Sequence, residues 1–236
     1  MKRWTVGLAA LVVLVGAIES QGALINNGDF ELGNTGFTSD YTYVTPTVGL
    51  AQYYVSTNPQ AVHPSWYSFG DHTTGTGMML IVNGGDDAGL RVWIQEVTLT
   101  AGDTYEFSAW GTSVYPVAPG NLIFEIGGTS LGTLELTSTV PDWKEFSTTF
   151  TASTSGPSEL VAIRDLETAY SGNDFALDDI SLELVQQQSP AIPEPATIVI
   201  WSLLGLTFAG AYRWRRRNGW SKGTTEAIHE MIDRDQ

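Results

Sequence analysis

Hydrophobic and polar residues alternate along the chain between residues 24 and 185. In the stretch Arg91 to Thr100, every second side chain falls on one face of an extended strand, namely Trp93, Gln95, Val97 and Leu99. The stretch Thr104 to Val114 alternates in the same way, with Phe107 on one face and Trp110 on the other. A period of two residues is typical of half-buried β-strands, so both stretches are predicted as strands.

Further short apolar stretches continue this pattern through the rest of the segment. They are separated by residues that favour turns, chiefly Gly, Ser and Thr. The additional predicted strands are Met78 to Val82, Leu122 to Ile126, Leu131 to Leu136, Trp143 to Phe150, Leu160 to Arg164 and Phe175 to Leu184. Roughly eight to ten short strands at this spacing predict an all-β fold, an antiparallel β-sandwich formed by one domain over residues 24–185.

The N-terminal residues 1–22 have the composition of a signal peptide. Lys2 and Arg3 form a basic start, and Val6 to Ile18 is an apolar run of 13 residues, which is short for a membrane-spanning helix. The triplet Ser20-Gln21-Gly22 is a tolerable cleavage site. The alternative is an uncleaved N-terminal anchor.

The C-terminal part of the chain has three successive segments. Residues 186–195 form a polar linker, residues 196–212 are 17 residues without a charge, and residues 213–236 begin with a basic cluster. The arginines of this cluster are Arg213, Arg215, Arg216 and Arg217. The uncharged segment is at the short end for a transmembrane helix, and its basic flank is expected to stay cytoplasmic, which places the β-rich domain outside. The alternative, a buried core helix, does not account for the abrupt change to arginines.

These C-terminal features, with the motif Pro193, Glu194 and Pro195 in the linker, resemble the PEP-CTERM sorting signal. That signal is found in Gram-negative bacteria that make extracellular polysaccharide. The resemblance implies an exosortase, a membrane cysteine protease, as a partner that cuts near the Pro-Glu-Pro motif. It also implies a protein anchored in the inner membrane by one helix and then placed on the cell surface or in the extracellular matrix. Residues 218–236, a polar tail of 19 residues, extend past the usual end of such signals.

The charge of the chain is strongly negative and unevenly distributed. The formal net charge is −15, and the 20 Asp and Glu residues between Leu24 and Pro190 face three bases, Arg91, Lys144 and Arg164. An acidic domain repels phosphate backbones, so nucleic acid is not expected as a partner. The sequence has no cysteine, which excludes disulfides, thiolate metal sites and a cysteine nucleophile.

Three stretches of the β-rich segment, at 26–31, 95–110 and 173–182, carry a second similarity. They read NNGDFE, QEVTLTAGDTYEFSAW and NDFALDDISL. In this order they resemble galactose-binding-like jelly rolls, in particular carbohydrate-binding modules of the cellulase-C N-terminal type. The stretch FGDHTTG at 69–75 resembles a subgroup of such domains that carry PEP-CTERM tails. The resemblance implies a jelly-roll sandwich and a carbohydrate ligand.

The same resemblance implies a structural calcium ion that joins the first strand to the last. By position, Glu31 and Asp178 would supply carboxylates and Gly28 a backbone carbonyl, which are the oxygen ligands that calcium prefers. Asp179 is the less favoured ligand, because neighbouring strand residues point to opposite faces. The alternative is that Asp178 and Asp179 are turn or edge residues without a metal.

Aromatic and polar side chains of the segment are candidates for a carbohydrate-binding surface. Sugar rings stack on aromatic rings, and their hydroxyl groups need amide, carboxyl or guanidinium partners. Trp93 shares a face with Val97 and is expected in the core. The candidates that we single out are Trp66 and Tyr67, from a polar loop region, and Trp110, Glu106 and Arg91. For any one of these aromatic residues, a place in the core is the alternative.

Catalytic motifs are missing from the sequence. It contains no His-Glu-x-x-His motif, nucleophile elbow or phosphate-binding loop, and no pair of carboxylates is distinguished from the rest. We therefore expect a non-catalytic protein that binds or embeds in extracellular polysaccharide. The alternatives are a structural or adhesive matrix protein without a sugar site, and an envelope enzyme that acts on glycosidic bonds through two facing carboxylates.

Overall fold

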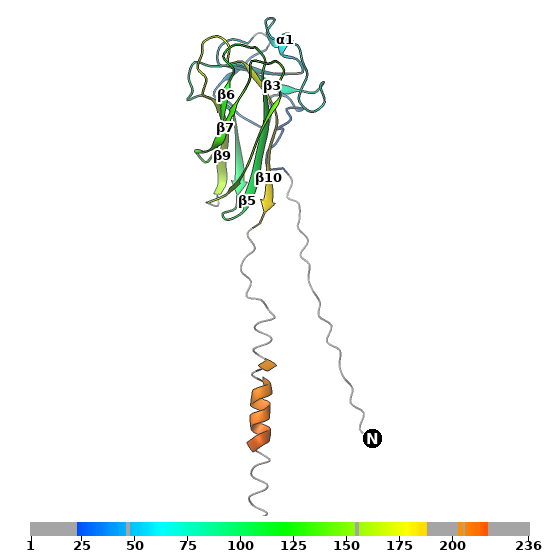
Figure 1. Cartoon of the computed structure of the whole chain (residues 1–236), viewed down its shortest axis with the longest axis vertical. Helices are drawn as coiled ribbons and strands as arrows, with labels where there is room; N and C mark the ends of the chain where they lie inside the picture. Colours follow the sequence, from blue (N-terminus) through cyan, green and yellow to red (C-terminus); the bar gives the residue numbers. More distant parts are fainter. Residues whose placement is uncertain (1–22, 46–47, 154–155, 188–202, 205, 217–236) are drawn as a thin grey trace, which may run out of the picture. The chain divides into compact units, whose positions relative to one another are not determined.

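The chain divides into two compact units, Met1–Gln188 and Ser189–Gln236. The computed structural model (Figure 1) describes residues 23–45, 48–153, 156–187, 203–204 and 206–216. The predicted signal peptide, the Pro-Glu-Pro motif and the predicted tail after the arginines lie outside the described residues.

Residues 23–187 form a sandwich of two β-sheets. The first sheet has six strands, in the spatial order β1 (Thr42–Tyr43), β2 (Gln52–Ser56), β3 (Met79–Asn83), β10 (Phe175–Gln186), β5 (Thr104–Ser113) and β8 (Lys144–Thr151). The second sheet has four strands, in the order β4 (Arg91–Leu99), β9 (Gly156–Asp165), β6 (Asn121–Ile126) and β7 (Thr129–Glu135). All of these neighbours pair antiparallel except β1 and β2. The predicted all-β, antiparallel sandwich is confirmed.

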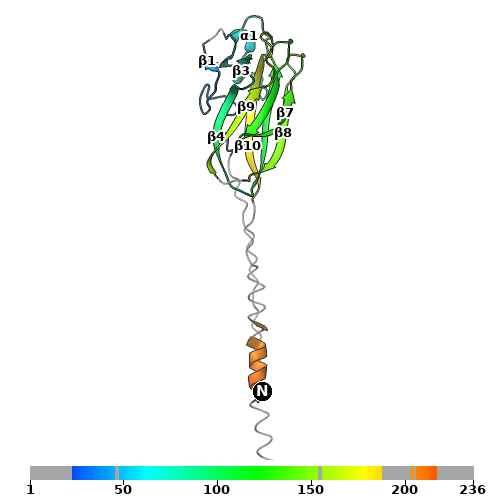
Figure 2. The ribbon, with the colours of Figure 1, turned by 90° about the vertical axis from the view of Figure 1, so that its left-hand side faces the viewer.

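The chain changes from one sheet to the other between β3 and β4, and again between β4 and β5. From β3 to β6 and from β7 to β10, strands that follow each other in sequence lie in opposite sheets, which is the arrangement of a jelly roll. The strands run along the length of the sandwich, with the short helix α1 (Pro59–Val62) at one end and the last residues of β10 at the other (Figures 1 and 2).

The main core lies between the two sheets and is rich in aromatic residues. Trp93 of β4, Phe107 of β5 and Phe124 of β6 are fully buried there. The ring centroids of Phe107 and Phe124 lie 5.5 Å apart, so the two sheets contact each other through aromatic side chains. The expected core position of Trp93 is confirmed.

A second apolar cluster covers the outer face of the six-stranded sheet. Strand β3 is buried on both faces: Leu80 and Val82 face the main core, and Met79 and Ile81 face the second cluster. The connection between α1 and β3 contributes Trp66 to this cluster, where it is buried. That connection therefore packs onto the sheet and is not a loop projecting into solvent.

The pairings of β10 define the two ends of the sandwich. Its first residue, Phe175, pairs with Ser113, and its last residue, Gln186, pairs with Thr104. The connections that follow β3, β5 and β9 meet at the Phe175 end, which we call the loop end. These connections are residues 84–90, 114–120 and 166–174.

In the C-terminal unit, residues 203–204 and 206–216 are helical. The guanidinium of Arg216 lies 5.9 Å from the centre of the Tyr212 ring. The sequence predicts a transmembrane helix over residues 196–212, part of which lies outside the described residues. Within the part of the chain that the structure describes, no helix is both long and apolar enough to cross a membrane.

Asp165, the last residue of β9, is a carboxylate buried at the loop end. Its Oδ1 accepts hydrogen bonds from the backbone nitrogens of Asn121, at 2.9 Å, and Glu167, at 3.0 Å. Its Oδ2 is buried and finds no hydrogen-bond partner among the described residues. Burial raises the pKa of Asp165 to about 7, and the charges of Glu167 and Asp174 add to the effect.

We expect the substitution Asp165→Asn to stabilise the fold at neutral pH and to change it little near pH 4. The carboxyl titrates near 3.8 in the unfolded chain and near 7 in the fold, so between these values the folded wild type holds a proton that the unfolded chain has lost. The free energy of unfolding of the wild type therefore falls as pH rises through this window. The variant escapes this loss, which the two pKa values put at about 4 kcal/mol at neutral pH.

Urea unfolding of the wild type and of Asp165→Asn, at several values between about pH 4 and about pH 8, measures this difference. The asparagine keeps an oxygen in the place of Oδ1, so the bonds from Asn121 and Glu167 are preserved. Stability curves that run parallel over the whole range would contradict the expected titration of Asp165.

Candidate functional site

A polar pocket of about 240 Å³ opens at the loop end of the sandwich. Its walls come from four separate parts of the chain: the connection before β3, the end of β3, the connection after β5 and the connection before β10. The lining residues are His63, Ser65, Trp66, Asn83, Tyr115, Tyr170, Ser171, Gly172 and Asp174. Sequence-distant segments therefore build one site, at the end opposite the last residue of β10.

The first wall is positioned by α1 and the turn that follows it. Asn58 caps the helix, because its side chain accepts a hydrogen bond from the backbone nitrogen of Gln60 at 2.9 Å. The helix ends at Val62 with His63 as its C-cap, and the backbone nitrogen of Trp66 donates to the carbonyl of His63 at 3.0 Å. The rings of His63 and Trp66 lie 4.9 Å apart, so the cap and the turn together hold both rings at the pocket.

Asp174 is the carboxylate of the pocket, and only 6% of its surface is exposed. Its Oδ2 accepts a hydrogen bond from Trp66 Nε1 at 3.1 Å, and its Oδ1 accepts one from the backbone nitrogen of Gly84 at 3.3 Å. Burial raises the pKa of Asp174 to about 6. Each carboxylate oxygen has two lone pairs, so each retains capacity for a ligand donor.

Asn173 ties the connections behind the pocket together. Its side-chain nitrogen donates to the carbonyl of Gly85 at 2.9 Å and to that of Glu167 at 3.0 Å, and its backbone nitrogen donates to the carbonyl of Ala118 at 2.8 Å. Its φ of 51° lies in the left-handed region, which asparagine adopts more readily than most residues. This network holds the neighbouring Asp174 in place before β10 begins.

Two tyrosines form the more open part of the pocket. The side chain of Tyr170 is 78% exposed, and Tyr115 is half-buried. Asn83 contributes an amide at the end of β3. Aromatic faces next to amide and carboxylate groups are the combination that binds a carbohydrate.

Of the five predicted ligand-binding residues, only Trp66 lines this pocket. Tyr67 is 49% exposed next to it in sequence, and its backbone nitrogen donates to the carbonyl of Val114 at 3.1 Å. The sequence places Trp66 in a polar loop region, and its side chain is nevertheless buried, because the connection before β3 packs on the outer face of the sheet.

The other predicted ligand residues lie elsewhere and already have partners. Arg91 of β4 binds Asp40 through its Nε at 2.7 Å. Glu106 of β5 accepts a hydrogen bond from Ser147 Oγ at 3.0 Å. The structure does not bring either of them to Trp66.

Trp110 lies on the face of β5 opposite Phe107, as the alternation predicts, and it is half-buried. The ring of His72 stacks on it, with 3.8 Å between ring centroids and 16° between ring planes. In this structure the exposed face that a sugar would need on Trp110 is therefore taken by His72.

Sequence reasoning missed Tyr170, Asp174 and His63 as site residues. Asp174 belongs to the stretch 173–182 that resembles carbohydrate-binding modules, which was the available signal. Neither Tyr170 nor His63 lies in a sequence motif that marks it as a ligand-binding residue. Their place in the pocket depends on contacts between connections about 50 to 110 residues apart in sequence, such as the contact of Trp66 with Asp174.

The residues predicted to bind calcium accept hydrogen bonds from the backbone. The Gly28 carbonyl accepts from the nitrogen of Ile180 at 3.0 Å, and Glu31 Oε1 accepts from that of Met78 at 2.8 Å. Asp178, which is fully buried, accepts from the nitrogen of His72 at 2.9 Å. Burial raises the pKa of Asp178 to about 7, and the charge of Asp179 adds to it.

Other carboxylates lie near this group. A Cβ atom placed on Gly77 would meet Glu31 Oε1 and Asp71 Oδ2, so these two carboxylates reach the same side of Gly77. Asp71 also contributes to the raised pKa of Asp178. Within the described ranges, however, no group of three or more His, Asp or Glu residues is arranged to hold a metal ion.

The alternation of side chains breaks at Asp179. A bulge lies in β10 between Asp178 and Ser181, and Asp179 has a φ of 49°. As a result Asp179 Oδ2 contacts His72 Nδ1 at 2.7 Å, although Asp178 also contacts His72. The expectation that these two carboxylates point to opposite faces fails here because of the bulge.

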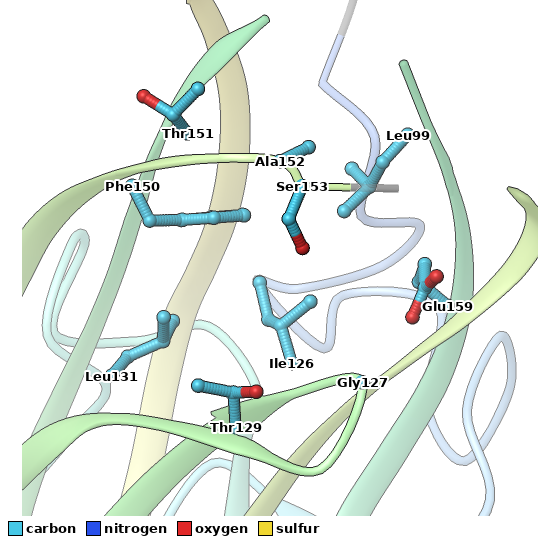
Figure 3. Close-up of a pocket in the computed structure, with 10 residues that line it drawn as sticks. All are labelled: Leu99, Ile126, Gly127, Thr129, Leu131, Phe150, Thr151, Ala152, Ser153 and Glu159. Atoms are coloured by element: carbon cyan, nitrogen blue, oxygen red, sulfur yellow. The ribbon is translucent and has the colours of Figure 1, made fainter. Parts of the chain in front are cut away.

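A second cavity, of about 190 Å³, lies at the other end of the sandwich (Figure 3). Ile126 and Ser153 project into it, and Leu131 and Phe150 form much of its wall. Gly127 and Gly128, both with positive φ, make the turn between β6 and β7 beside it. Its lining combines apolar side chains with those of Thr129, Thr151, Ser153 and Glu159. The pocket at the loop end has the more polar lining and presents two tyrosine rings beside a carboxylate, so it suits a carbohydrate better.

Solved structures with similar folds include several carbohydrate-binding modules. The CBM22-1 xylan-binding domain of Xyn10C from Paenibacillus barcinonensis is 17% identical, and the match covers 73% of this chain and 100% of that chain with a TM-score of 0.48. A family 16 carbohydrate-binding module is 25% identical, covering 67% and 98% with a TM-score of 0.41. A cyclase from Fischerella sp. TAU is 14% identical, covering 72% and 100% with a TM-score of 0.49.

Carbohydrate-binding modules, which the sequence resembles, are among the solved structures similar to this chain. Because each TM-score lies below 0.5, and the cyclase is among the similar structures, they carry no conclusion about what this chain binds. No curated protein matches the chain.

The C-terminal segment matches a described sorting signal. Residues 191–217 match the PEP-CTERM protein-sorting motif, which includes the Pro-Glu-Pro triplet, the uncharged segment and the arginine cluster. The chain therefore carries a PEP-CTERM protein-sorting motif C-terminal to its β-sandwich.

Proposed function

We propose that the β-sandwich is a non-catalytic, surface-displayed domain that binds a carbohydrate in the polar pocket at its loop end. The observation that carries this proposal is the exposed ring of Tyr170 beside the buried carboxylate of Asp174 in one pocket. A sugar ring has C–H faces that stack on aromatic rings, and hydroxyl groups that need polar partners. Tyr170 and Tyr115 supply the first, and Asp174, Asn83 and Ser65 supply the second.

The size of the pocket limits what enters it. Pockets for drug-sized ligands measure about 300–1,000 Å³. At about 240 Å³, this pocket suits a single sugar unit, such as a terminal residue or a branch of a polysaccharide. The remainder of the polymer would lie outside, next to Tyr170.

The two alternative functions have less support from this pocket. A glycoside hydrolase needs two facing carboxylates about 5–10 Å apart. Among the described residues that line the pocket, Asp174 is the only carboxylate. A purely structural or adhesive domain does not need an exposed aromatic ring beside a buried carboxylate. The pair of Tyr170 and Asp174 in this pocket is therefore better explained by a bound ligand.

We also propose that the sorting motif acts as the sequence suggests. Residues 1–22 direct export, residues 196–212 hold the chain in the inner membrane, and an exosortase cuts near Pro193-Glu194-Pro195. The domain then reaches the cell surface or the extracellular polysaccharide matrix. The support is the match of residues 191–217 to the sorting motif.

For the binding site, we expect Tyr170→Ala to weaken carbohydrate binding about tenfold, equivalent to about 1.4 kcal/mol. The melting temperature should stay within about 2 °C of the wild type, since Tyr170 is 78% exposed and contributes little to the core. Tyr67→Ala is the matched control, because Tyr67 is an exposed tyrosine outside the pocket lining.

A glycan array followed by titration calorimetry on the bound glycans measures both variants. If Tyr67→Ala weakens binding and Tyr170→Ala does not, the site is wrong. If no glycan binds the wild type, carbohydrate binding itself is refuted.

For the sorting signal, we expect Glu194→Ala to block processing in a Gram-negative host that carries an exosortase. The wild-type chain should be shortened near residue 194 and leave the membrane fraction, whereas the variant should keep its full mass in that fraction. Gln187→Ala, in the same linker, serves as the control. Intact-mass measurement of both fractions is the test, and a wild type that keeps residues 196–236 would refute the proposed cut.

We further propose that the Gly28 carbonyl and the carboxylates of Glu31 and Asp178 bind a structural calcium ion. The support is the approach of Glu31 and Asp71 at Gly77 and the raised pKa of Asp178, because crowded carboxylates favour a cation. We expect millimolar calcium to raise the melting temperature of the wild type by several degrees and to leave that of Asp178→Asn unchanged. Magnesium at the same concentration is the control ion. Equal shifts in the melting temperature of the wild type and of Asp178→Asn, or no shift of the wild type with calcium, would contradict the proposal.

A further inference from the structure

The basic side chains of the sandwich are all occupied by carboxylates. Between residues 24 and 190 the sequence has three bases, and the structure describes each of them. The nitrogen–oxygen distances are 2.7 Å for Arg91 with Asp40, 2.5 Å for Arg164 with Glu125 and 3.2 Å for Lys144 with Asp142. None of the three lines the polar pocket, so a uronic acid or a sulfated sugar would enter it without a cationic partner.

Negative charge, by contrast, gathers at the loop end. Asp174 faces the pocket, and its charge helps to raise the pKa of the nearby Asp165. Tyr41 lies in the same region, and burial raises its pKa to about 12, with the charges of Asp165, Asp87 and Asp86 adding to the effect. The local potential therefore disfavours anions and favours a positively charged ligand group.

The pocket also has the groups that hold an ammonium ion. Both oxygens of Asp174 retain an acceptor site after their bonds to Trp66 and Gly84. A cation is also attracted to the face of an aromatic ring, and Tyr115 and Tyr170 present such rings in the same pocket. An ammonium group, with three donors and one charge, matches this set.

His63 also lines the pocket, and its Nδ1 accepts a hydrogen bond from the backbone nitrogen of Ser65 at 3.4 Å.

We propose that the sugar unit bound in the polar pocket carries a free amino group, as in a hexosamine that has lost its N-acetyl group. This inference rests on the proposed function, because it names the chemical class of carbohydrate for the same site. The ammonium group contacts Asp174, and the sugar ring lies against the tyrosines. An N-acetyl group at that position would replace the charge with a neutral, bulkier amide.

The test compares three probes of equal length on the full chain, purified in mild detergent, by titration calorimetry at neutral pH. The probes are an oligomer of glucosamine, the matching oligomer of N-acetylglucosamine and an oligomer of galacturonic acid. We expect the glucosamine oligomer to bind at least about tenfold more tightly than the acetylated one, and the galacturonic acid oligomer to show no binding. The difference should shrink as salt is raised, since a partly exposed ion pair is screened.

Two variants locate the effect. Asp174→Asn keeps an oxygen that accepts from Trp66 but removes the charge, so the preference for the amine should fall to about twofold or less. Glu106→Gln removes a carboxylate of β5 that lies outside the pocket, and it should leave the preference unchanged. A melting curve for each variant checks that it is folded, and the probe comparison on the wild type needs no variant.

The outcomes separate this inference from the function on which it rests. If the acetylated oligomer binds as tightly as the amine, or the acidic oligomer binds most tightly, the amine assignment is overturned while carbohydrate binding stands. If none of these probes and no glycan on an array binds, carbohydrate binding falls, and the amine assignment falls with it. If Glu106→Gln abolishes the preference and Asp174→Asn does not, the site is misplaced.

Discussion

The structure depends on burial of β3 on both of its faces. Leu80 and Val82 contact the main core between the sheets, and Met79 and Ile81 contact a second cluster on the outer face. The outer cluster exists only because the connection before β3 lies over the sheet and places Trp66 there. Each Å² of apolar surface buried on the two faces of β3 contributes about 25 cal/mol to stability. This gain offsets the conformational entropy that the connection loses when it is ordered on the sheet. The indole of Trp66 then reaches Asp174, and the pocket forms beside it.

Most of the sandwich could be predicted from the sequence because strand patterns are local. The alternation around Trp93 and around Phe107 predicted β4, β5 and the residues that face the core. Trp110 was predicted on the face opposite Phe107, and it lies there. The pocket could not be predicted, since it forms where three connections meet the end of β3, and neither Tyr170 nor His63 lies in a sequence motif that indicates this meeting.

Two differences between expectation and structure have one physical source, which is the connection between α1 and β3. Trp66 was predicted in a polar loop region, yet it packs against the apolar outer face of β3 and is buried. The same connection continues to His72, whose ring covers Trp110 and whose backbone and ring contact Asp178 and Asp179. The bulge in β10 turns Asp179 toward His72. A pattern of alternating residues assumes a regular strand, so it does not predict where such a bulge lies.

Three buried carboxylates, Asp165, Asp174 and Asp178, all have pKa values raised by burial, so each costs stability in its charged form. Asp165 and Asp178 accept hydrogen bonds from backbone nitrogens and thereby hold connections in place. Asp174 does the same through Gly84, but it alone of the three lines the polar pocket. A cationic ligand group in the pocket can therefore offset the cost of the charge on Asp174, as the proposed calcium ion would at Asp178, whereas no ligand is proposed for Asp165. A buried carboxylate that faces a pocket costs the fold stability, so ligand binding explains its presence better than folding does.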